Sequence, residues 1–297
     1  MKKIILSLLA IAAMTGCTKS SEEEIDPNAP VEIEFGATIA STSRAVLKEN
    51  SAFNAYVVRE DVEGLTEPTF VKLTPIEANV DNAGKVTIAS QYYDTDNKTS
   101  YFIGFTADKT TTAATGESTA TVSYTGIDGL TDIMATKKLS AGSKTNKETV
   151  ILAYQHLLSQ LQFKFIAGAN FPETGIKVSS LKIKNVKNAA TLTLGDTPSL
   201  AFTGDATNEY TIFTSKEYEI TKAGTNATEA ALVEANLASI ELEITANGVI
   251  YNSTVTLTTA ASQAHVITLT FLPSNATFGT ATIGTWSNGA AGTGDAQ

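Results

Sequence analysis

Few residues in this chain are of the types that carry catalysis or bind metals. The only histidines are His156 and His265, and the only cysteine is Cys17. The histidines fall in or directly beside expected β-strands, where a lone histidine is more typical of structure than of catalysis. No His-x-x-x-His or Cys-x-x-Cys spacing, Gly-x-Ser-x-Gly elbow or glycine-rich phosphate loop occurs. We therefore expect no catalytic residues, no metal and no cofactor, in a chain that is not an enzyme.

Two weaker signals of chemistry have simpler interpretations. Asp94-Thr95-Asp96-Asn97 begins like a calcium-binding loop but lacks the later glycine and the bidentate glutamate, so we expect a solvated turn. Carboxylate pairs of the glycosidase kind meet only in the folded chain. No such pair stands out in the sequence.

The single cysteine ends an export signal. Lys2 and Lys3 precede an apolar run that is too short to span a bilayer as a helix. Met14-Thr15-Gly16-Cys17 resembles a bacterial lipobox, a signal whose cysteine is diacylated and becomes the first residue of the mature protein. The alternative is an ordinary secretory signal with a chance cysteine. We expect residues 1–16 to be removed and Cys17 to anchor the protein in the outer membrane. With one cysteine, no disulfide forms within the chain.

The remaining chain is acidic and long enough for two domains. Removing the signal leaves 281 residues (297 − 16), and losing Lys2 and Lys3 changes the net charge from −10 to −12. Such a surface disfavours nucleic acid and anionic lipid headgroups as partners. Residues 17–30 form a polar linker. Its Ser21-Glu22-Glu23-Glu24 stretch is either a plain acidic tether or, by resemblance, the surface-export signal of some Gram-negative lipoproteins.

From Val31 onward the hydrophobic pattern has a period of two, which indicates β-strands. In the first expected strand, one face carries Val31, Ile33, Phe35, Ala37 and Ile39. The other face carries Glu32, Glu34 and Thr38. We expect Ile33 and Phe35 to be buried and the two glutamates to face water. Further strands are expected at 53–58, 69–73, 85–89, 101–105, 120–124, 150–154, 158–166, 178–183, 190–194, 210–220, 240–244, 249–257, 265–271 and 281–286.

Two segments depart from this pattern. Residues 108–118 are rich in threonine and alanine and are expected to form a loop, and residues 228–237 are expected to form a short helix. Short strands separated by glycine, asparagine and aspartate indicate antiparallel β-sandwiches. We predict an all-β chain of two sandwiches, residues 31–148 and 149–297, joined by the polar stretch 140–148.

Four stretches, in order along the chain, are similar to one protein family. They are the lipobox with its acidic linker, VEIEFGATIASTSRA from Val31, the pair Asp132-Ile133-Met134-Ala135 and VILAYQHLLSQLQFKF, and the closing ATIGTWSNG. The third is similar to an aspartate-led block followed by His-x-x-Ser-x-x-x-Phe, and the last to a terminal Ile-x-x-Trp-x-x-Gly. The chain thus resembles the fimbrillins, the lipoprotein-derived subunits and accessory proteins of type V pili.

The resemblance implies two transthyretin-like sandwiches and a structural subunit of a surface fimbria that contributes to adhesion. It also implies that an arginine-specific protease cuts in the loop after the first strand, here between Arg44 and Ala45. The first strand then leaves, and a strand from another pilus subunit fills the groove.

The donor strand, by family analogy, lies near residues 271–288. Its candidate residues are Phe271, Phe278, Ala281, Ile283 and Trp286. Because Phe278, Ala281, Ile283 and Trp286 do not share one parity, the sequence does not set the register of this strand.

Physical reasoning supports such a mechanism. If the apolar face of the first strand packs on the core, its removal exposes an apolar groove and an unpaired sheet edge, which is a template for another strand. The alternative is that Arg44 is an ordinary exposed loop arginine. The chain would then be a non-polymerising surface lipoprotein, either a pilus anchor or tip or an adhesin for a glycan or host ligand. Sugar sites usually display several aromatic platforms, and the single tryptophan, Trp286, favours assembly.

Overall fold

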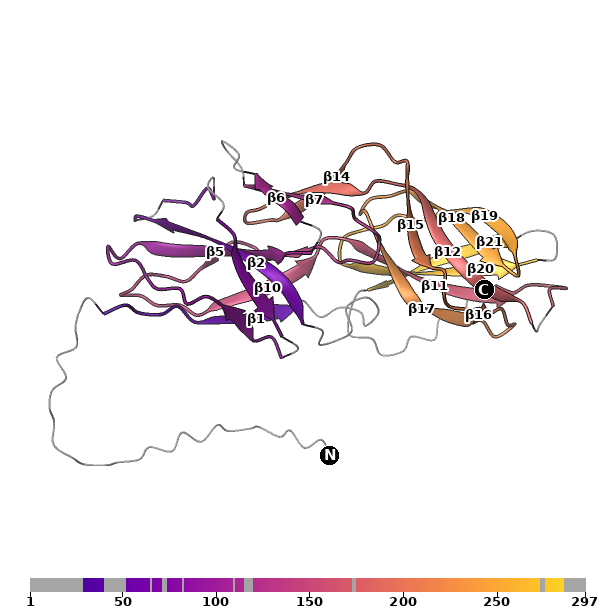
Figure 1. Ribbon diagram of the computed structural model, residues 1–297, viewed down its shortest axis with the longest axis horizontal. Coiled ribbons are helices and arrows are strands. Elements are labelled where there is room, and N and C mark those ends of the chain that lie inside the picture. The colour runs from indigo at the N-terminus through magenta and orange to yellow at the C-terminus, as the bar shows by residue number, and fades with distance from the viewer. Residues whose placement is uncertain are drawn as a thin grey trace, which may run out of the picture. The chain divides into compact units, whose positions relative to one another are not determined.

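The computed structural model describes residues 29–39, 52–64, 66–70, 74–81, 83–108, 110–114, 120–172, 175–272 and 276–285 (Figure 1). Residues Val31–Gln297 group into one compact unit. All regular elements in the described ranges are β-strands, so the predicted all-β class is confirmed. Those ranges contain no helix long and apolar enough to cross a membrane.

The strands are short, as the turn spacing predicts. They are β1 (Phe35–Ile39), β2 (Phe53–Val62), β3 (Ile76–Val80), β4 (Val86–Ile88), β5 (Thr99–Thr106), β6 (Thr110–Ala114), β7 (Thr121–Thr125), β8 (Met134–Ala135), β9 (Leu139–Ser140), β10 (Val150–His156), β11 (Ser159–Ala167), β12 (Lys177–Val186), β13 (Ala189–Thr193), β14 (Ser199–Thr203), β15 (Asn208–Phe213), β16 (Tyr218–Glu219), β17 (Thr225–Val233), β18 (Ser239–Ala246), β19 (Val249–Thr256), β20 (Gln263–Phe271) and β21 (Ala276–Thr285).

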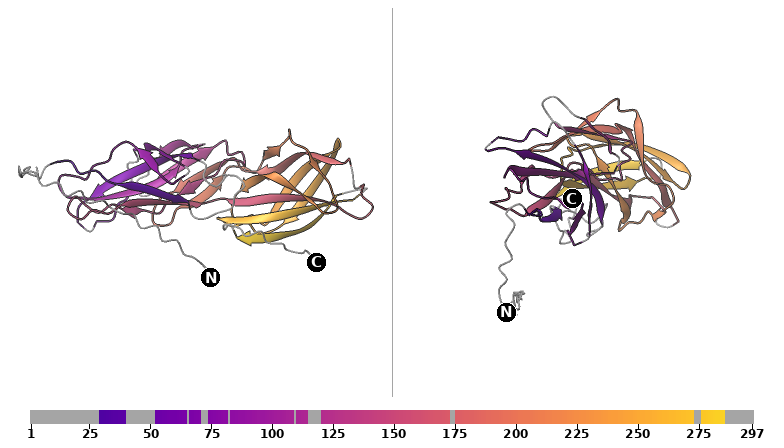
Figure 2. Two further views of the ribbon diagram at one scale, coloured as in Figure 1. Left: turned by 90° about the horizontal axis from the view of Figure 1, so that it is seen from below. Right: turned by 60° about the vertical axis from the view of Figure 1, so that its left-hand side comes forward.

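The described strands pair into four sheets. One has the order β1-β10-β8-β5-β2-β3-β4, with β9 attached to β5, and a second has the order β14-β13-β7-β6. The third runs β17-β11-β20-β21, and the fourth runs β15-β12-β18-β19 with β16 attached to β12. The C-terminal strands β20 and β21, drawn in yellow, lie side by side in Figure 2 as their antiparallel pairing requires.

Two of the sheets contain strands from both sides of residue 148. β10 pairs with β1 and β8. Likewise, β13 pairs with β7, so that β13 and β14 extend the sheet of β7 and β6. The division into domains 31–148 and 149–297, and their transthyretin-like layout, stay predictions.

Four sequence-based assignments are wrong in whole or in part. In the strand expected at 69–73, Thr69 and Phe70 are irregular and 71–73 lie outside the described residues, and the strand expected at 210–220 is interrupted between β15 and β16. The expected helix at 228–237 is instead the end of β17, which pairs with β11 from Thr225 to Val233. The last four residues of β17, Ala230–Val233, are all buried, so tertiary packing overrides the helix propensity of its alanines. The expected loop at 108–118 contains β6, which pairs with β7. A threonine-rich strand can form without apolar alternation because its ladder partner supplies the hydrogen bonds.

Two buried clusters form the core. The smaller one lies under the sheet that contains β1 and includes Ile33, Ala37, Phe53, Val57, Phe102, Leu152 and Tyr154. The larger one includes Tyr124, Phe163, Phe165, Leu242, Leu269 and Phe271. The first strand therefore depends on its own core cluster, separate from the larger one.

The third stretch of family similarity has two parts, the block that begins at Asp132 and the segment that contains His156. These two parts meet in the interior. His156 Nδ1 contacts Asp132 Oδ2, and both side chains are buried. Beside them the Leu157 amide donates to Ile133 O at 3.0 Å, and Ser262 Oγ donates to His156 O at 2.7 Å. These contacts fix the end of β10, the strand on which β1 rests.

A pair of buried tyrosines provides a test of this core. Tyr154 and Tyr124 are both fully buried, and burial raises the pKa of each phenol, so both remain protonated. Tyr124 Oη donates to Thr106 O at 2.9 Å, whereas Tyr154 Oη has no hydrogen-bond partner among the described residues. Tyr154→Phe should raise the free energy of unfolding by about 1 kcal/mol, because it removes an unsatisfied buried polar group.

Tyr124→Phe is the matched control and should lower the free energy of unfolding by about 1 kcal/mol, because it breaks a satisfied bond. Urea unfolding of the two variants measures both values. Equal destabilisation by the two substitutions would show that the Tyr154 hydroxyl is satisfied in solution.

Candidate functional site

The first strand has the alternation that its sequence predicts. Ile33 and Ala37 are buried, at 3% and 8% exposure, and Val31, Phe35 and Ile39 pack on the same cluster while partly buried. Glu32, Glu34 and Thr38 are exposed. Phe35 is less buried than expected. Its ring rests edge-on against Phe102 with the centroids 5.0 Å apart.

One edge of the first strand pairs with β10. The two strands run parallel, with Phe35 opposite Val150 and Ile39 opposite Tyr154. The Val150 amide also donates to Glu34 O at 3.0 Å, just before the ladder begins.

The other edge is bonded to segments that lie between β3 and β5. The Ile33 amide donates to Gln91 O at 2.7 Å, and the Tyr93 amide donates to Val31 O at 2.9 Å. Further along, the Ala37 amide donates to Gly84 O at 2.9 Å. Gly84 and residues 91–93 are called the wall below. The first strand thus occupies a groove with backbone partners on both sides, which is the geometry of an inserted strand.

Glycine is required at one point of the wall. Gly84 has φ +79°, a conformation that side chains rarely adopt, and a Cβ placed on it would lie 2.4 Å from Ala37 O. The turn before β4 can approach the first strand so closely only without a side chain.

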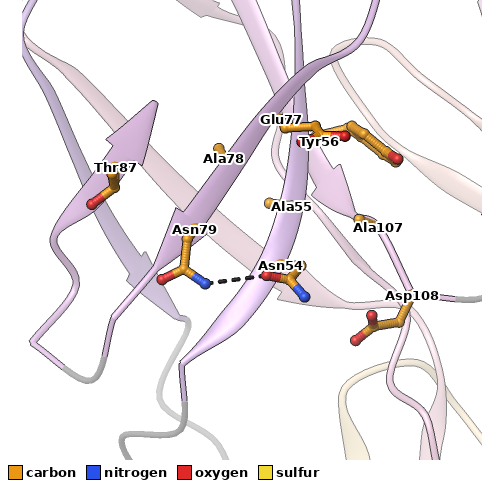
Figure 3. A pocket seen from close by; sticks show the side chains of 9 residues that line it. All are labelled: Asn54, Ala55, Tyr56, Glu77, Ala78, Asn79, Thr87, Ala107 and Asp108. Atoms are coloured by element: carbon orange, nitrogen blue, oxygen red, sulfur yellow. Dashed lines mark hydrogen bonds between the residues drawn. The ribbon is translucent and has the colours of Figure 1, made fainter. Parts of the chain in front are cut away.

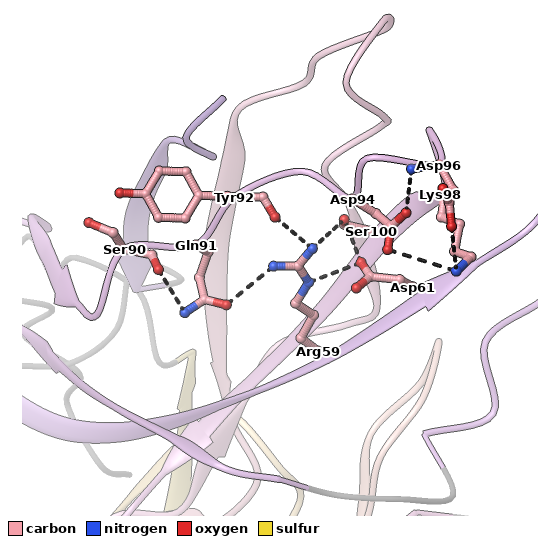
Figure 4. Close-up of polar contacts among 9 residues, drawn as sticks. All are labelled: Arg59, Asp61, Ser90, Gln91, Tyr92, Asp94, Asp96, Lys98 and Ser100. Atoms are coloured by element: carbon pink, nitrogen blue, oxygen red, sulfur yellow. Dashed lines mark hydrogen bonds and ion pairs between the residues drawn. The ribbon is translucent and has the colours of Figure 1, made fainter. Parts of the chain in front are cut away.

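Arg59 in β2 holds the other part of the wall (Figure 4). Its Nη2 donates to Tyr92 O at 2.8 Å, and its Nε donates to Asp61 Oδ1 at 2.9 Å. Ser100 Oγ accepts from Nη2 at 3.2 Å and donates to the same Asp61 oxygen at 2.6 Å. The guanidinium lies 5.7 Å from the centre of the Phe102 ring, the ring that Phe35 contacts. One side chain therefore touches both the wall and the floor of the groove.

Tyr93 provides a second anchor for the wall. Its buried hydroxyl donates to Ala141 O at 2.8 Å, and burial raises the pKa of the phenol, so it remains a donor at neutral pH. Sequence reasoning missed Arg59, Gly84 and Tyr93. No local motif marks them, because the contacts that shape the wall join residues far apart in sequence, from 33 positions for Arg59 and Tyr92 O to 62 positions (93 − 31) for the Tyr93 amide and Val31 O.

The C-terminal strand has one pairing partner among the described strands. Phe271 is a fully buried residue of β20, and β21 pairs antiparallel with β20 at the edge of its sheet. Phe278 is opposite Leu269, Ala281 is opposite Ile267 and Ile283 is opposite His265, with a register shift between Ile267 and Leu269. That irregularity explains why these three positions differ in parity along the chain yet lie opposite alternate residues of β20.

Four predicted site residues fall outside the described ranges. They are Cys17, Arg44, Ala45 and Trp286. Asp94-Thr95-Asp96-Asn97 forms a turn, as expected, in which the Asp96 amide donates to Asp94 Oδ1 at 2.7 Å. Lys98 Nζ lies 3.8 Å and 3.7 Å from the carboxylates of Asp94 and Asp96. The residues with assigned positions contain no group of three or more His, Cys, Asp or Glu side chains that could hold a metal.

The role of Arg59 can be measured directly. Arg59→Ala leaves Tyr92 O and the Asp61 carboxylate without their charged donor, and should lower the free energy of unfolding by about 1–3 kcal/mol. It should also speed hydrogen exchange at the Ile33 and Tyr93 amides, which bond across the groove.

Lys177→Ala is the control. It breaks an ion pair with Glu217 whose two side chains are half exposed, at 50% and 59%, and should change neither quantity measurably. Unchanged exchange at Ile33 and Tyr93 in Arg59→Ala would mean that Arg59 does not hold the wall.

Comparison with known proteins places this chain in a family. The family model described as fimbrillin-like matches residues 38–286. No curated protein sequence matches the chain significantly. A crystal structure of a proposed cell adhesion protein from Bacteroides uniformis has a similar fold, with a TM-score of 0.59 at 16% identity, covering 87% of this chain and 99% of that one. A second, from Bacteroides ovatus, has a TM-score of 0.59 at 14% identity, covering 88% and 100%. The chain belongs to the fimbrillin-like family.

Proposed function

We propose that this chain is a structural subunit of a surface fimbria, assembled when another subunit's strand replaces its first strand. Membership of the fimbrillin-like family supports a pilus-related or surface-adhesion role. The proposed strand replacement rests on one observation, which is how the backbone of the first strand is held in its groove. It is bonded on one edge to β10 and on the other to the wall, so its departure leaves a groove with two unpaired edges.

The proposal begins at the membrane. Acyl chains on Cys17 hold the exported chain at the outer membrane, and two or more chains give stable attachment where one does not. Residues 17–30 then separate the anchor from the first strand. The cut between Arg44 and Ala45 follows that strand, so that cleavage separates it from the rest of the chain.

Arginine usage supports a specific cut. The sequence contains 19 lysines but two arginines, Arg44 and Arg59. Arg59 lies within β2, where the ladder with β5 pairs it with Phe102, and its guanidinium is bonded to Asp61 and Tyr92 O. Because Arg59 is held within a strand by these contacts, Arg44 is the better substrate for an arginine-specific protease.

Cleavage alone does not empty the groove. One peptide bond is broken, but the buried Ile33 side chain still contributes roughly 1.5–3 kcal/mol, and the backbone bonds on both edges remain. Release therefore needs a competing strand that pairs as the old one leaves. The first strand is parallel to β10 and its bridge to the wall, Glu32 to Tyr92, is antiparallel. An incoming strand in the same direction can therefore take over both sets of backbone bonds as the first strand leaves.

The candidate donor is the C-terminal strand of another copy or of an accessory subunit. In this chain β21 occupies a sheet edge and pairs only with β20 among the described strands. Phe278, Ala281 and Ile283 lie on it, Phe271 precedes it, and Trp286 follows it. When one subunit donates and the next accepts, the contact is heterologous and produces a filament.

The proposal predicts that assembly depends on one residue. Purified protein treated with an arginine-specific protease should be cut after Arg44 and then form filaments, visible as ladders on gels and by electron microscopy. The Arg44→Lys variant keeps the positive charge but removes the cleavage site, so it should remain monomeric under the same treatment.

A peptide covering residues 271–288 should bind the cut wild-type protein and block filament growth. The peptide fills the groove but has no groove of its own to accept a further strand. If the protein is cut at Arg44 but stays monomeric in the absence of peptide, and the cut protein does not bind the peptide, the subunit proposal fails. The chain would then be a non-polymerising lipoprotein: a pilus anchor, a tip or a ligand-binding adhesin.

A further inference from the structure

The outer face of the sheet formed by β2, β3 and β4 is hollowed. The hollow has a volume of about 520 Å³ and includes among its lining residues Asn54, Tyr56, Glu77, Asn79, Thr87 and Asp108 (Figure 3). Ala55 and Ala78 alternate with these residues and also border the hollow, but both belong to the buried cluster under the sheet. The hollow is thus distinct from the groove of the first strand, and its volume is in the range of small-molecule sites.

Two residues of the hollow, Asn54 and Asn79, are poor choices for a stable strand. Asn54 and Asn79 are directly opposite each other in β2 and β3, and both are exposed. Asparagine is depleted in strands, where threonine or valine would pair better at such positions. Residues whose strand propensity is poor, and which bring no evident gain in stability, are expected at functional sites.

The two asparagines hold each other in a useful orientation. Asn79 Nδ2 donates to Asn54 Oδ1 at 3.2 Å, as Figure 3 shows. The Asn79 amide oxygen and the Asn54 amide nitrogen are left at the two outer ends of this bonded pair, as Figure 3 shows. The pair thus offers one acceptor and one donor at separate points, and each can bond a hydroxyl group, because a hydroxyl can both donate and accept.

The rest of the lining selects among ligand classes. Glu77 and Asp108 accept hydrogen bonds, and Thr87 can donate or accept. The lining contains no lysine, arginine or histidine, so anionic ligands are disfavoured. Tyr56 is partly buried, with its ring 5.9 Å from that of Phe105, and offers a fixed aromatic surface. Polar groups around one aromatic surface suit a sugar, whose hydroxyls and C–H faces need both.

We propose that this hollow binds a neutral glycan, with Asn54 and Asn79 contacting a pair of hydroxyls, Glu77 and Asp108 accepting from others, and Tyr56 packing against the sugar ring. The site needs neither cleavage nor assembly, since all its residues belong to the uncut chain. It would give each subunit of a fimbria its own contact with a glycan surface.

The test uses the uncut protein and a panel of neutral oligosaccharides: maltohexaose, xylohexaose, mannohexaose, cellohexaose and N-acetyllactosamine. Saturation-transfer NMR should detect binding of at least one at millimolar concentration, and calorimetry then gives its Kd. Asn79→Ala and Glu77→Gln should each raise that Kd about tenfold or more. Their thermal unfolding should match wild type, since both side chains are exposed.

Asn226→Ala is the matched control, because Asn226 is an exposed strand asparagine in β17, away from the lining residues. It should leave the Kd unchanged. The proposal is overturned if no sugar of the panel binds, or if Asn79→Ala binds as tightly as wild type. It is also overturned if tetralysine, and no sugar, binds and loses affinity in Glu77→Gln, because the hollow would then recognise positive charge. None of these outcomes depends on whether the chain forms filaments.

Discussion

The structure depends on one gap in a sheet being filled. The edge of β10 and the wall, Gly84 with residues 91–93, both present backbone groups to the space between them, and a single five-residue strand with its preceding segment satisfies both. An unpaired edge on either side would invite uncontrolled pairing with other chains, and the apolar floor formed by Phe102 and Leu152 would be exposed with it. The first strand therefore protects the subunit as well as completing its fold.

Features far apart in the sequence keep this gap the width of one strand. Gly84 lets the β3–β4 turn approach Ala37 O, and Arg59 ties Tyr92 O to Asp61 and to the face of Phe102. On the opposite side, the buried contact between Asp132 and His156 fixes the end of β10. These residues do not belong to the first strand, so their contacts with one another do not require it. The proposed exchange needs this property, because the groove must keep its two edges while one strand replaces another.

Sequence reasoning reached the fold class, the parity of the first strand and most strand positions, because burial on one face imposes a period of two that is visible locally. It failed at residues 228–237, where alanines suggested a helix but burial against β11 imposed a strand, and at 108–118, where β6 forms without apolar alternation. The wall and the polar hollow could not be predicted from one sequence. Arg59 meets Tyr92 across 33 positions, and Asn54 meets Asn79 across 25, so their pairing follows from strand register alone.

The central claim, that the first strand must leave for assembly, is tested most directly by locking it in place. Thr38 and Ala153 are opposite each other in β1 and β10 and are both exposed, so cysteines at these positions can form a disulfide without disturbing the core. The measurement is filament formation by Thr38→Cys/Ala153→Cys protein, in a Cys17→Ser background, after cleavage by the arginine-specific protease. We expect monomers while the disulfide is intact and filaments once a reductant is added. Filaments that form equally fast with the disulfide intact would contradict the central claim.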